Sequence, residues 1–544
     1  MHFRPGTITC ILMPVHQIRP LISLSLTYVG DNAAQFVAAR DRVLDVAAPS
    51  SYQLALECLD HCARFHEQCP KPMAATLPDR VIDCSTPENP KIVLTNGNMQ
   101  GLYVTLSYIW GGPQPTSSTQ NIEMHVTQGL KMKDFPNTIR EAVSATHRLG
   151  LRYLWIDALC ILQDSMKDKI RQIGMMGSIY QNSYVTIIAA CGNNVNEGFL
   201  HQSRPQKIPD ARIPYICPDG KIGSVWIAEA QDHSPNDCSR SYYDDLEPIN
   251  YRGWCLQERL LSSRCLIYAS HTLQYDCQAE TVNIGQALCE RGTISRLPSI
   301  TFPASPSDQI RARRAWISTI WDYSSRNLTV SADKLVAFAG VAECFQRFFS
   351  SNYLAGLWEN SLLLDLLWFK VSDEPLPRIR PTEYRAPSWS WASIDGRVQF
   401  QMLEHITKSS ECEVVKCEVL GCKVAPLNKD MPFCQVDTGT LILNGLLKEV
   451  KLDSEEKSSN VLIRSGPEGA LMNIGQATFD AGERRDKTYC IPLMWDKGGA
   501  FVEGLIVSAV SGGCFRRVGR FTNKYKSTDI KWIEGASKQT LKII

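Results

Sequence analysis

The run Tyr153–Leu159 constrains the fold of this chain more than any other segment. It is nearly continuously apolar, which is typical of a strand covered on both faces in a parallel sheet. Further buried strands are expected at Tyr103–Tyr108 and Tyr184–Ala190, and apolar residues recur at helical spacing over 136–149 and 166–180. Alternating strands and helices predict an α/β fold with a doubly wound, mostly parallel sheet.

The length of 544 residues exceeds one ordinary core, so two or three domains are expected. We predict a lead segment at 1–50 and an α/β domain with its leader at 51–290, of which 101–265 is the core. A mainly helical region is expected at 291–400. Short alternating strands separated by Gly, Asn and Asp predict a β-rich C-terminal region at 401–544.

Composition favours a soluble globular protein, with 44% apolar and 21% charged residues. Lys plus Arg total 57 against 56 for Asp plus Glu, so the net charge gives no attraction for nucleic acid or an anionic membrane. The 20 cysteines show no repeated spacing, which favours reduced thiols. We expect a cytoplasmic protein that binds neither nucleic acid nor membrane.

The first residues contain a short apolar run, Ile8–Val15, which Pro14 interrupts. His16 and Arg19 follow where a signal peptide would place small residues for cleavage, so a secretory signal is not expected. No stretch reaches the roughly 20 uninterrupted apolar residues that a membrane helix needs.

Polar side chains follow two of the predicted strands. In open α/β sheets, ligands bind beyond the carboxyl ends of strands, at the point where strand order reverses. Asp157 lies near the end of its strand, and Ser107, Tyr108 and Trp110 lie near the end of theirs. We expect them to line one crevice that holds a small molecule or another protein. The alternative is that Trp110 is a core aromatic while Asp157 caps a helix or pairs with an arginine.

The segment Arg252–Arg264 raises a similar question. Glu258 lies beside Trp254 and Gln257 in the sequence, where desolvation would raise its pKa and suit it to general-base chemistry. Alternatively, nearby arginines neutralise it in a structural network, which is the commoner outcome: Arg252, Arg259 and Arg264.

The candidate catalytic residues are therefore Asp157 and Glu258. Cys160 offers a thiol, but no His is close in sequence, so a buried inert cysteine is the simpler interpretation. The remaining candidates are residues of the predicted crevice: Ser107, Tyr108, Trp110, Gly111, Cys160, Gln163, Asp164, Arg252, Trp254 and Gln257.

A cluster of thiols and imidazoles raises the question of zinc: Cys58, His61, Cys62, His66 and Cys69. The apolar and Cys positions over 52–69 fit one helix that Pro70 ends. On one helix, Cys58 and Cys69 would be about 16 Å apart, too far to share an ion. Pairs such as Cys58 with Cys62 would need ligands from elsewhere. We predict no metal and a helix face on which Cys packs as a small apolar residue.

Several motifs are absent from the sequence. It has no phosphate-binding Gly-x-x-x-x-Gly-Lys-Ser/Thr loop, no Gly-x-Gly-x-x-Gly, no His-Glu-x-x-His and no Gly-x-Ser-x-Gly. We therefore expect neither a nucleotide-hydrolysing P-loop nor a zinc-protease site.

Long Trp-rich motifs, in collinear order, resemble those of the fungal heterokaryon-incompatibility (HET) domain family. The motifs that carry the resemblance are Leu77–Asp83, Leu106–Gly111, Pro136–Thr138, Tyr153–Ile161, Gln163–Asp164, Met176, Ile179–Tyr180 and Arg252–Glu258. Flanking features of large fungal proteins of this group are also present: Asp333–Leu335, Tyr353–Trp358, Pro387–Trp391 and Phe515–Gly519. Two positions depart from the family pattern, Ile109, where Cys or Arg is frequent, and Cys255, where Thr is common.

The resemblance implies an effector of fungal non-self recognition and programmed cell death that acts by association with other proteins or with itself. HET domains have also been likened to the TIR fold, which agrees with a flavodoxin-like α/β sheet. Some TIR-like domains cleave NAD with a glutamate, which does not align here residue by residue. The alternative function is therefore nucleotide cleavage with NAD as substrate and no bound cofactor, using Glu258 or Asp157, with Trp110 or Trp254 stacked on the base.

Overall fold

The structure is a computed structural model whose contacts divide the chain into two compact units, Met1–Ser299 and Ile300–Ile544. Much of the predicted lead segment, including the run at 8–15, lies outside the described residues. The structure describes residues 23–26, 31–37, 43–204, 211–229, 247–286, 296–297, 305–371, 380–401, 412–414, 417–452, 460–465, 472–482, 487–496, 502–523 and 537–544.

The first unit contains an eight-stranded sheet in the order β13-β12-β11-β8-β6-β7-β3-β4. Its strands are β3 Arg80–Asp83, β4 Lys91–Leu94, β6 Tyr103–Ser107, β7 Tyr153–Trp155, β8 Val185–Ile188, β11 Arg264–Tyr268, β12 Leu273–Cys277 and β13 Thr281–Asn283. The predicted mixed α/β architecture is confirmed. The parallel part is smaller than predicted: only β7-β6-β8-β11 run parallel, because both edges are built by antiparallel pairing.

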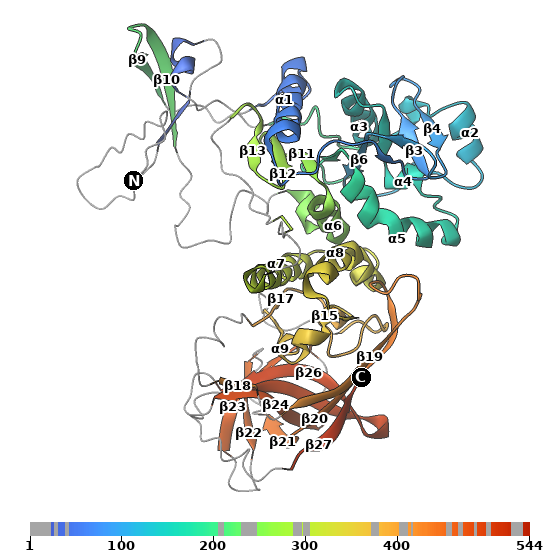
Figure 1. Cartoon of the computed structure of the whole chain (residues 1–544), viewed down its shortest axis with the longest axis vertical. Coiled ribbons are helices and arrows are strands. Elements are labelled where there is room, and N and C mark those ends of the chain that lie inside the picture. Colours follow the sequence, from blue (N-terminus) through green and yellow to red (C-terminus); the bar gives the residue numbers. More distant parts are fainter. Residues whose placement is uncertain are drawn as a thin grey trace. The chain divides into compact units, whose positions relative to one another are not determined.

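Helices cover both faces of this sheet (Figure 1). Helices α1 and α3 lie on one face, and α5 and α6 lie on the other. The helices of this unit are α1 Pro49–Phe65, α2 Ile122–Thr127, α3 Asn137–Arg148, α4 Asp157–Cys160, α5 Met166–Asn182 and α6 Gly253–Leu261. The apolar stripe of α3, which includes Ile139, Ala142 and Val143, is buried, as its 3.6-residue spacing predicts.

The order of the four parallel strands places a topological switch point between β6 and β8. In chain order β6 is first, β7 second, β8 third and β11 fourth, so they lie side by side as 2-1-3-4. The connections that leave β6 and β8 therefore diverge to opposite sides. A ligand-binding crevice in such a sheet is expected at the carboxyl ends of these two strands.

Two predicted elements are shorter than expected. The strand expected over Tyr153–Leu159 ends at Trp155, because Asp157 begins the one-turn helix α4. The helix expected over 52–69 ends at Phe65, because His66 adopts an extended conformation at φ −87° and ψ 110°. The premise of one continuous helix from Cys58 to Cys69 is therefore wrong.

A small antiparallel sheet, β1-β10-β9, also belongs to the first unit. Its strands are β1 Ser23–Leu26, β9 Ala211–Ile216 and β10 Ile222–Glu229. The Asp31 side chain caps the short helix at Asn32–Gln35 and also accepts a hydrogen bond from the Ser224 backbone at 2.8 Å. No helix in the described parts of the chain is both long and apolar enough to cross a membrane.

The second unit begins with two helices, α7 Pro306–Ser324 and α8 Ala339–Phe349, with the four-residue α9 Leu362–Asp365 after them. Trp316 of α7 packs against Phe345 of α8 and against Trp358, with ring centroids 5.2 and 5.3 Å away. The described parts of the chain also contain two-stranded sheets. These pair β2 Ala75–Thr76 with β5 Gln100–Gly101 in the first unit, and β14 Tyr353–Leu354 with β15 Leu357–Trp358 and β16 Phe369–Lys370 with β17 Val398–Gln399 in the second.

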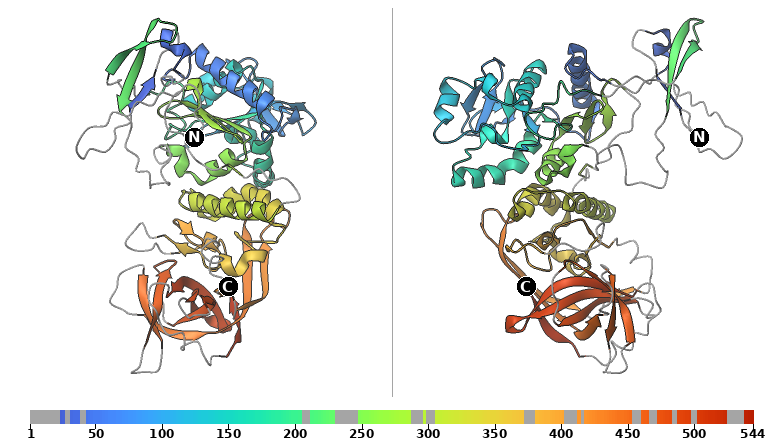
Figure 2. Two further views of the ribbon diagram at one scale, coloured as in Figure 1. Left: turned by 60° about the vertical axis from the view of Figure 1, so that its left-hand side comes forward. Right: turned by 180° about the vertical axis from the view of Figure 1, so that it is seen from behind.

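The β-rich C-terminal region is confirmed as a ten-stranded sheet. Six of its strands close a ring, because β24 pairs with β25 and β21, β26 pairs with β25 and β23, and β22 joins β21 to β23 (Figure 2). The ten strands are β18 Cys412–Val414, β19 Glu418–Pro426, β20 Val436–Gly445, β21 Lys448–Leu452, β22 Asn460–Ser465, β23 Met472–Phe479, β24 Thr488–Asp496, β25 Val502–Val510, β26 Cys514–Thr522 and β27 Gln539–Ile543.

Candidate functional site

The end of β6 brings together residues from the first two polar segments. Ser107 is the last residue of β6 and is buried. The buried Tyr108 hydroxyl donates to Gln114 Oε1 at 3.1 Å. The half-buried Trp110 indole Nε1 donates to Asp157 Oδ2 at 2.9 Å. Residues 47 positions apart in sequence therefore meet where β6 and β7 end.

Asp157 occupies the first position of α4, and its Oδ1 accepts from the Ala158 backbone at 2.7 Å. The side chain thus contacts the next residue of its own helix and the indole, but it does not cap the helix, because the N-cap residue of α4 is Ile156. Burial raises the pKa of Asp157 to about 6, although the Ala158 and Trp110 hydrogen bonds act in the opposite direction.

Glu258 lies on α6 and is only 5% exposed. Burial raises the pKa of Glu258 to about 8, and the nearby Asp157 charge adds to the increase. Glu258 Oε2 and Ser107 Oγ are buried without a partner in ordinary hydrogen-bond geometry among the described residues, yet the two side chains lie close enough that the Ser107 hydroxyl lowers the Glu258 pKa. The structure therefore brings Trp110, Asp157 and Glu258 into one cluster, in which the two carboxyl groups interact electrostatically.

Buried hydroxyl groups tie α6 to the sheet. Ser262 Oγ donates to the Glu258 carbonyl at 2.6 Å and lies 2.5 Å from Thr186 Oγ1 of β8. Thr186 Oγ1 in turn lies 2.6 Å from Thr105 Oγ1 of β6. Sequence reasoning missed these residues. They could have been found from the threonines inside strands that are otherwise apolar, because a buried hydroxyl group needs a hydrogen-bond partner and therefore indicates a second polar residue nearby.

The arginines near Glu258 have other partners. Arg259 Nε lies 3.5 Å from Asp276, and Arg264 donates to the carbonyl oxygens of Tyr184 and Pro70. The structural network predicted for these two arginines therefore leads away from Glu258. Arg252, at the start of α6, contributes a small lowering of the Glu258 pKa. On the same helix, Trp254 is half-buried and Gln257 is buried.

The candidates on and after α4 have structural partners. Cys160 is buried, and burial raises the pKa of its thiol to about 12, which argues against a nucleophilic role. Gln163 Nε2 donates to the Asp157 carbonyl at 3.2 Å. Asp164 is exposed and accepts from the Thr119 backbone at 2.9 Å. Gln163 thus supports Asp157, whereas Asp164 fixes a surface loop.

Gly111 fixes the backbone next to the Trp110 indole. Its φ is +63°, and a Cβ atom there would lie 2.3 Å from the Asn194 Cβ. The Val195 backbone donates to the Trp110 carbonyl at 3.1 Å. The loop after β8 therefore packs directly on the loop after β6, at an approach that only glycine permits.

Residues 103–258 match the family model described as heterokaryon incompatibility protein (HET). The chain carries a HET domain. The match runs from the first residue of β6 to Glu258, so it includes all three members of the Trp110–Asp157–Glu258 cluster. No curated protein and no solved structure shows a significant match to the chain. The resemblance inferred from the motifs is confirmed for the HET domain.

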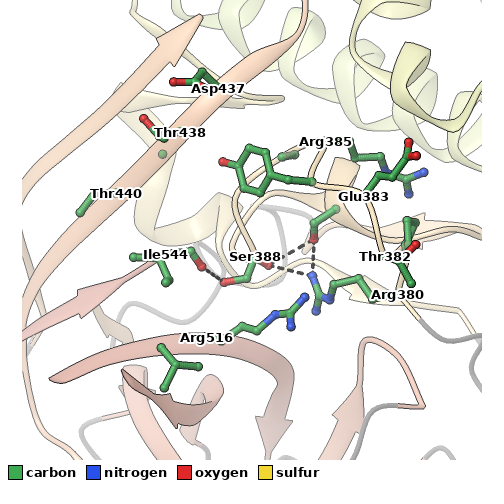
Figure 3. Close-up of a pocket in the computed structure, with 16 residues that line it drawn as sticks. Arg380, Thr382, Glu383, Arg385, Ser388, Asp437, Thr438, Thr440, Arg516 and Ile544 are labelled. Atoms are coloured by element: carbon green, nitrogen blue, oxygen red, sulfur yellow. Dashed lines mark hydrogen bonds between the residues drawn. The ribbon is translucent and has the colours of Figure 1, made fainter. Parts of the chain in front are cut away.

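The second unit contains a separate cavity of about 520 Å³, of a size that suits a small molecule (Figure 3). Three arginines lie around it: Arg380, Arg385 and Arg516. Arg380 lies 3.6 Å from Asp480, and Arg385 lies 2.7 Å from Asp395, so the charges of these two are offset inside the unit. Sequence reasoning did not predict this cavity, and only the Trp-rich run at 385–393 distinguishes the region in the sequence.

Proposed function

We propose that this HET-domain protein is an effector of fungal non-self recognition and cell death that acts in the cytoplasm by protein association. The observation that carries the proposal is the match of residues 103–258 to the HET family over the Trp110–Asp157–Glu258 cluster. The proposed contact surface is the cluster together with the exposed part of Trp110 and of Trp254 on α6. Partly exposed tryptophans are favoured anchors of protein interfaces.

The carboxyl pair supports a role beyond stability. Burying Glu258 raises its pKa well above the ordinary value, so this residue costs folding stability at neutral pH. In its buried surroundings the Glu258 carboxyl group has only the Ser107 hydroxyl and the Cys255 thiol as side-chain groups that lower its pKa by hydrogen bonding. Chains retain such costly groups mainly at functional sites, where a partner or ligand satisfies them.

Inducible expression in a filamentous fungus tests the effector function. We expect the intact chain to arrest growth, and we expect Asp157→Asn and Glu258→Gln to relieve the arrest at equal protein abundance. Asp164→Asn serves as the matched control, because Asp164 is exposed and accepts hydrogen bonds from Thr119 in a surface loop. Normal growth on strong expression of the intact chain would contradict the proposal.

A second candidate, cleavage of a nucleotide such as NAD, is favoured by the 2.9 Å contact between the Trp110 indole and Asp157. A half-buried indole whose edge binds a carboxyl group with a raised pKa suits base stacking on the ring and acid–base chemistry at the carboxyl group. The 2-1-3-4 order of the parallel strands supports a flavodoxin-like or TIR-like assignment. Incubation of the concentrated protein with NAD should release nicotinamide; the absence of release with intact growth arrest would leave association as the function.

A further inference from the structure

Three thiols and one imidazole lie close together beside the eight-stranded sheet of the first unit. Cys62 comes from α1, His66 and Cys69 come from the segment after it, and Cys277 ends β12. One potential ligand atom from each residue lies within 4.8 Å of all the others. The three cysteines are each less than 5% exposed. The early end of α1 at Phe65 makes this possible, because it lets the chain turn and bring Cys69 back toward Cys62.

We propose that Cys62, His66, Cys69 and Cys277 hold a structural zinc ion. A tetrahedral site with ordinary zinc–sulfur and zinc–nitrogen bonds separates a sulfur from a nitrogen ligand by about 3.6 Å. The His66 Nδ1 atom lies 3.4 Å from the Cys277 sulfur and 3.8 Å from the Cys69 sulfur. The spacing therefore fits a three-thiolate, one-imidazole site.

The second ring nitrogen of His66 supports this assignment. Its Nε2 lies 3.3 Å from Glu280 Oε1, in the turn between β12 and β13. Zinc-bound histidines usually donate their other ring N–H to a carboxylate, which fixes the tautomer and orients the ring. In the zinc-bound form, Glu280 would hold the His66 ring with Nδ1 directed toward the three sulfur atoms.

The charge around the cluster also suits zinc. Three thiolates and one zinc ion carry a net charge of −1, which needs an offset in a buried position. Arg264 is 2% exposed and lies near Cys62, and among the described residues its Nε has no hydrogen-bond partner.

Simple packing of small apolar cysteines explains the cluster less well. Cys58 lies one helical turn before Cys62, yet it is not a member of the cluster, and burial raises the pKa of its thiol to about 11. The described residues contain one other potential metal-binding set, formed by His61, His66 and Glu280. In that set His61 and Glu280 are more exposed than the cysteines, and no thiol is present. Soft thiolate ligands make the cysteine set the better zinc site.

The proposed ion would join segments far apart in sequence. Cys62–Cys69 precede the family match at 103–258, and Cys277 follows it. All four coordination positions are filled by protein atoms, so the site is closed and structural rather than catalytic. On binding, each thiol loses its proton to solvent, and the ion fixes α1 to β12 at one end of the sheet.

Metal analysis of the purified full-length protein tests the site. After expression with added zinc, we expect about one zinc ion per chain. Cys69→Ser and Cys277→Ser should each lower the zinc content roughly ten-fold, whereas Cys58→Ser should leave it unchanged. Glu280→Gln should weaken the affinity about ten-fold in competition with a chelator, because it removes the partner of His66 Nε2.

Cobalt binding gives an independent measurement on the unaltered chain, in case the cysteine variants fail to fold. Replacement of zinc by Co²⁺ should produce the strong visible absorption and thiolate charge-transfer bands of a tetrahedral sulfur-rich site. The proposal would be overturned by a chain without stoichiometric zinc, by a disulfide between two of the three cysteines, or by an equal loss of zinc in Cys58→Ser.

Discussion

Glu258 shows how one residue links the fold to the proposed site. Its carbonyl accepts from Ser262 and so anchors α6, while its carboxyl group lies buried near Asp157. The backbone of this residue stabilises the structure, whereas its side chain destabilises it at neutral pH. These opposite contributions can be separated by experiment.

Replacing Glu258 with Gln tests the buried carboxyl group through the pH dependence of stability. The folded-state pKa of about 8 lies above the ordinary value of 4.5. Below pH 4.5 the group is protonated in both states and costs nothing. Between pH 4.5 and 8 the unfolded chain ionises while the folded chain keeps its proton, so the wild type loses stability. We expect Glu258→Gln to gain on the order of 4 kcal/mol over the wild type across this range, measured by urea unfolding.

Asp164→Asn is the matched control for this experiment. Hydrogen bonds from Thr119 hold the pKa of the exposed Asp164 below its usual range, so this carboxylate stabilises the fold above that range. The stability of Asp164→Asn relative to the wild type should therefore not increase when the pH is raised from 4.5 to 8. Parallel stability curves for wild type and Glu258→Gln would contradict the burial argument.

Residue types near the cluster could be predicted from the sequence, but their partners could not. The positions of Trp110 and Asp157 at strand ends follow from the hydrophobic pattern. Their direct hydrogen bond depends on the reversal of strand order beside β6, which the pattern does not specify. Three of the four proposed zinc ligands, Cys62, His66 and Cys69, are visible in the sequence, but the expectation of one continuous helix kept them apart. The fourth, Cys277, could not be connected to them, because it lies more than 200 residues from Cys69.

The elements that carry the cluster are short and held by tight contacts. Strand β7 spans only Tyr153–Trp155, and the strand prediction extended too far because the apolar run continues through the buried face of α4. Apolar continuity cannot separate a strand from a buried helical turn. The loops after β6 and β8 approach each other at Gly111, where the close contact with Asn194 leaves no space for a side chain.

Gly111→Ala should destabilise the first unit more than Gly150→Ala. Both glycines have a left-handed backbone, with φ +63° and +71°, so both substitutions cost about 1 kcal/mol of backbone strain. Only at Gly111 would the new Cβ collide with a neighbour, whereas nothing lies within 4 Å at Gly150. We expect a total cost of about 3 kcal/mol for Gly111→Ala in urea unfolding. Equal costs would show that the loops separate readily.

At the scale of the whole molecule, the chain has two compact units, and each is stabilised by its own buried interactions. In the second unit, Arg517 of β26 is fully buried, pairs with Asp480 at 3.0 Å and donates to the Leu366 carbonyl at 2.7 Å. Its guanidinium also lies 3.5 Å from the centre of the Trp368 ring. The segment after α9 is thereby bound to the β-rich sheet, although the sequence predicted these as separate regions.

Arg517→Met should lower the stability of the second unit by about 4 kcal/mol, because it leaves Asp480 buried and without this partner. Arg516→Met is the matched control, because Arg516 is exposed and should change stability little. Calorimetry of the full chain resolves the result by unit: we expect one transition to shift in Arg517→Met while the other keeps its temperature. A uniform shift of both transitions would show that the units unfold together.

The pairing of the central strands has a practical consequence for anyone who excises the HET match. Strands β3 and β11, which flank β7 and β8, both lie outside residues 103–258. A fragment cut at those limits would expose bare N–H and C=O rows on two apolar strands, which are templates for intermolecular pairing. Such a fragment should precipitate or form adventitious oligomers. Self-association of the fragment would then result from its exposed strand edges and would not be evidence that the intact protein self-associates.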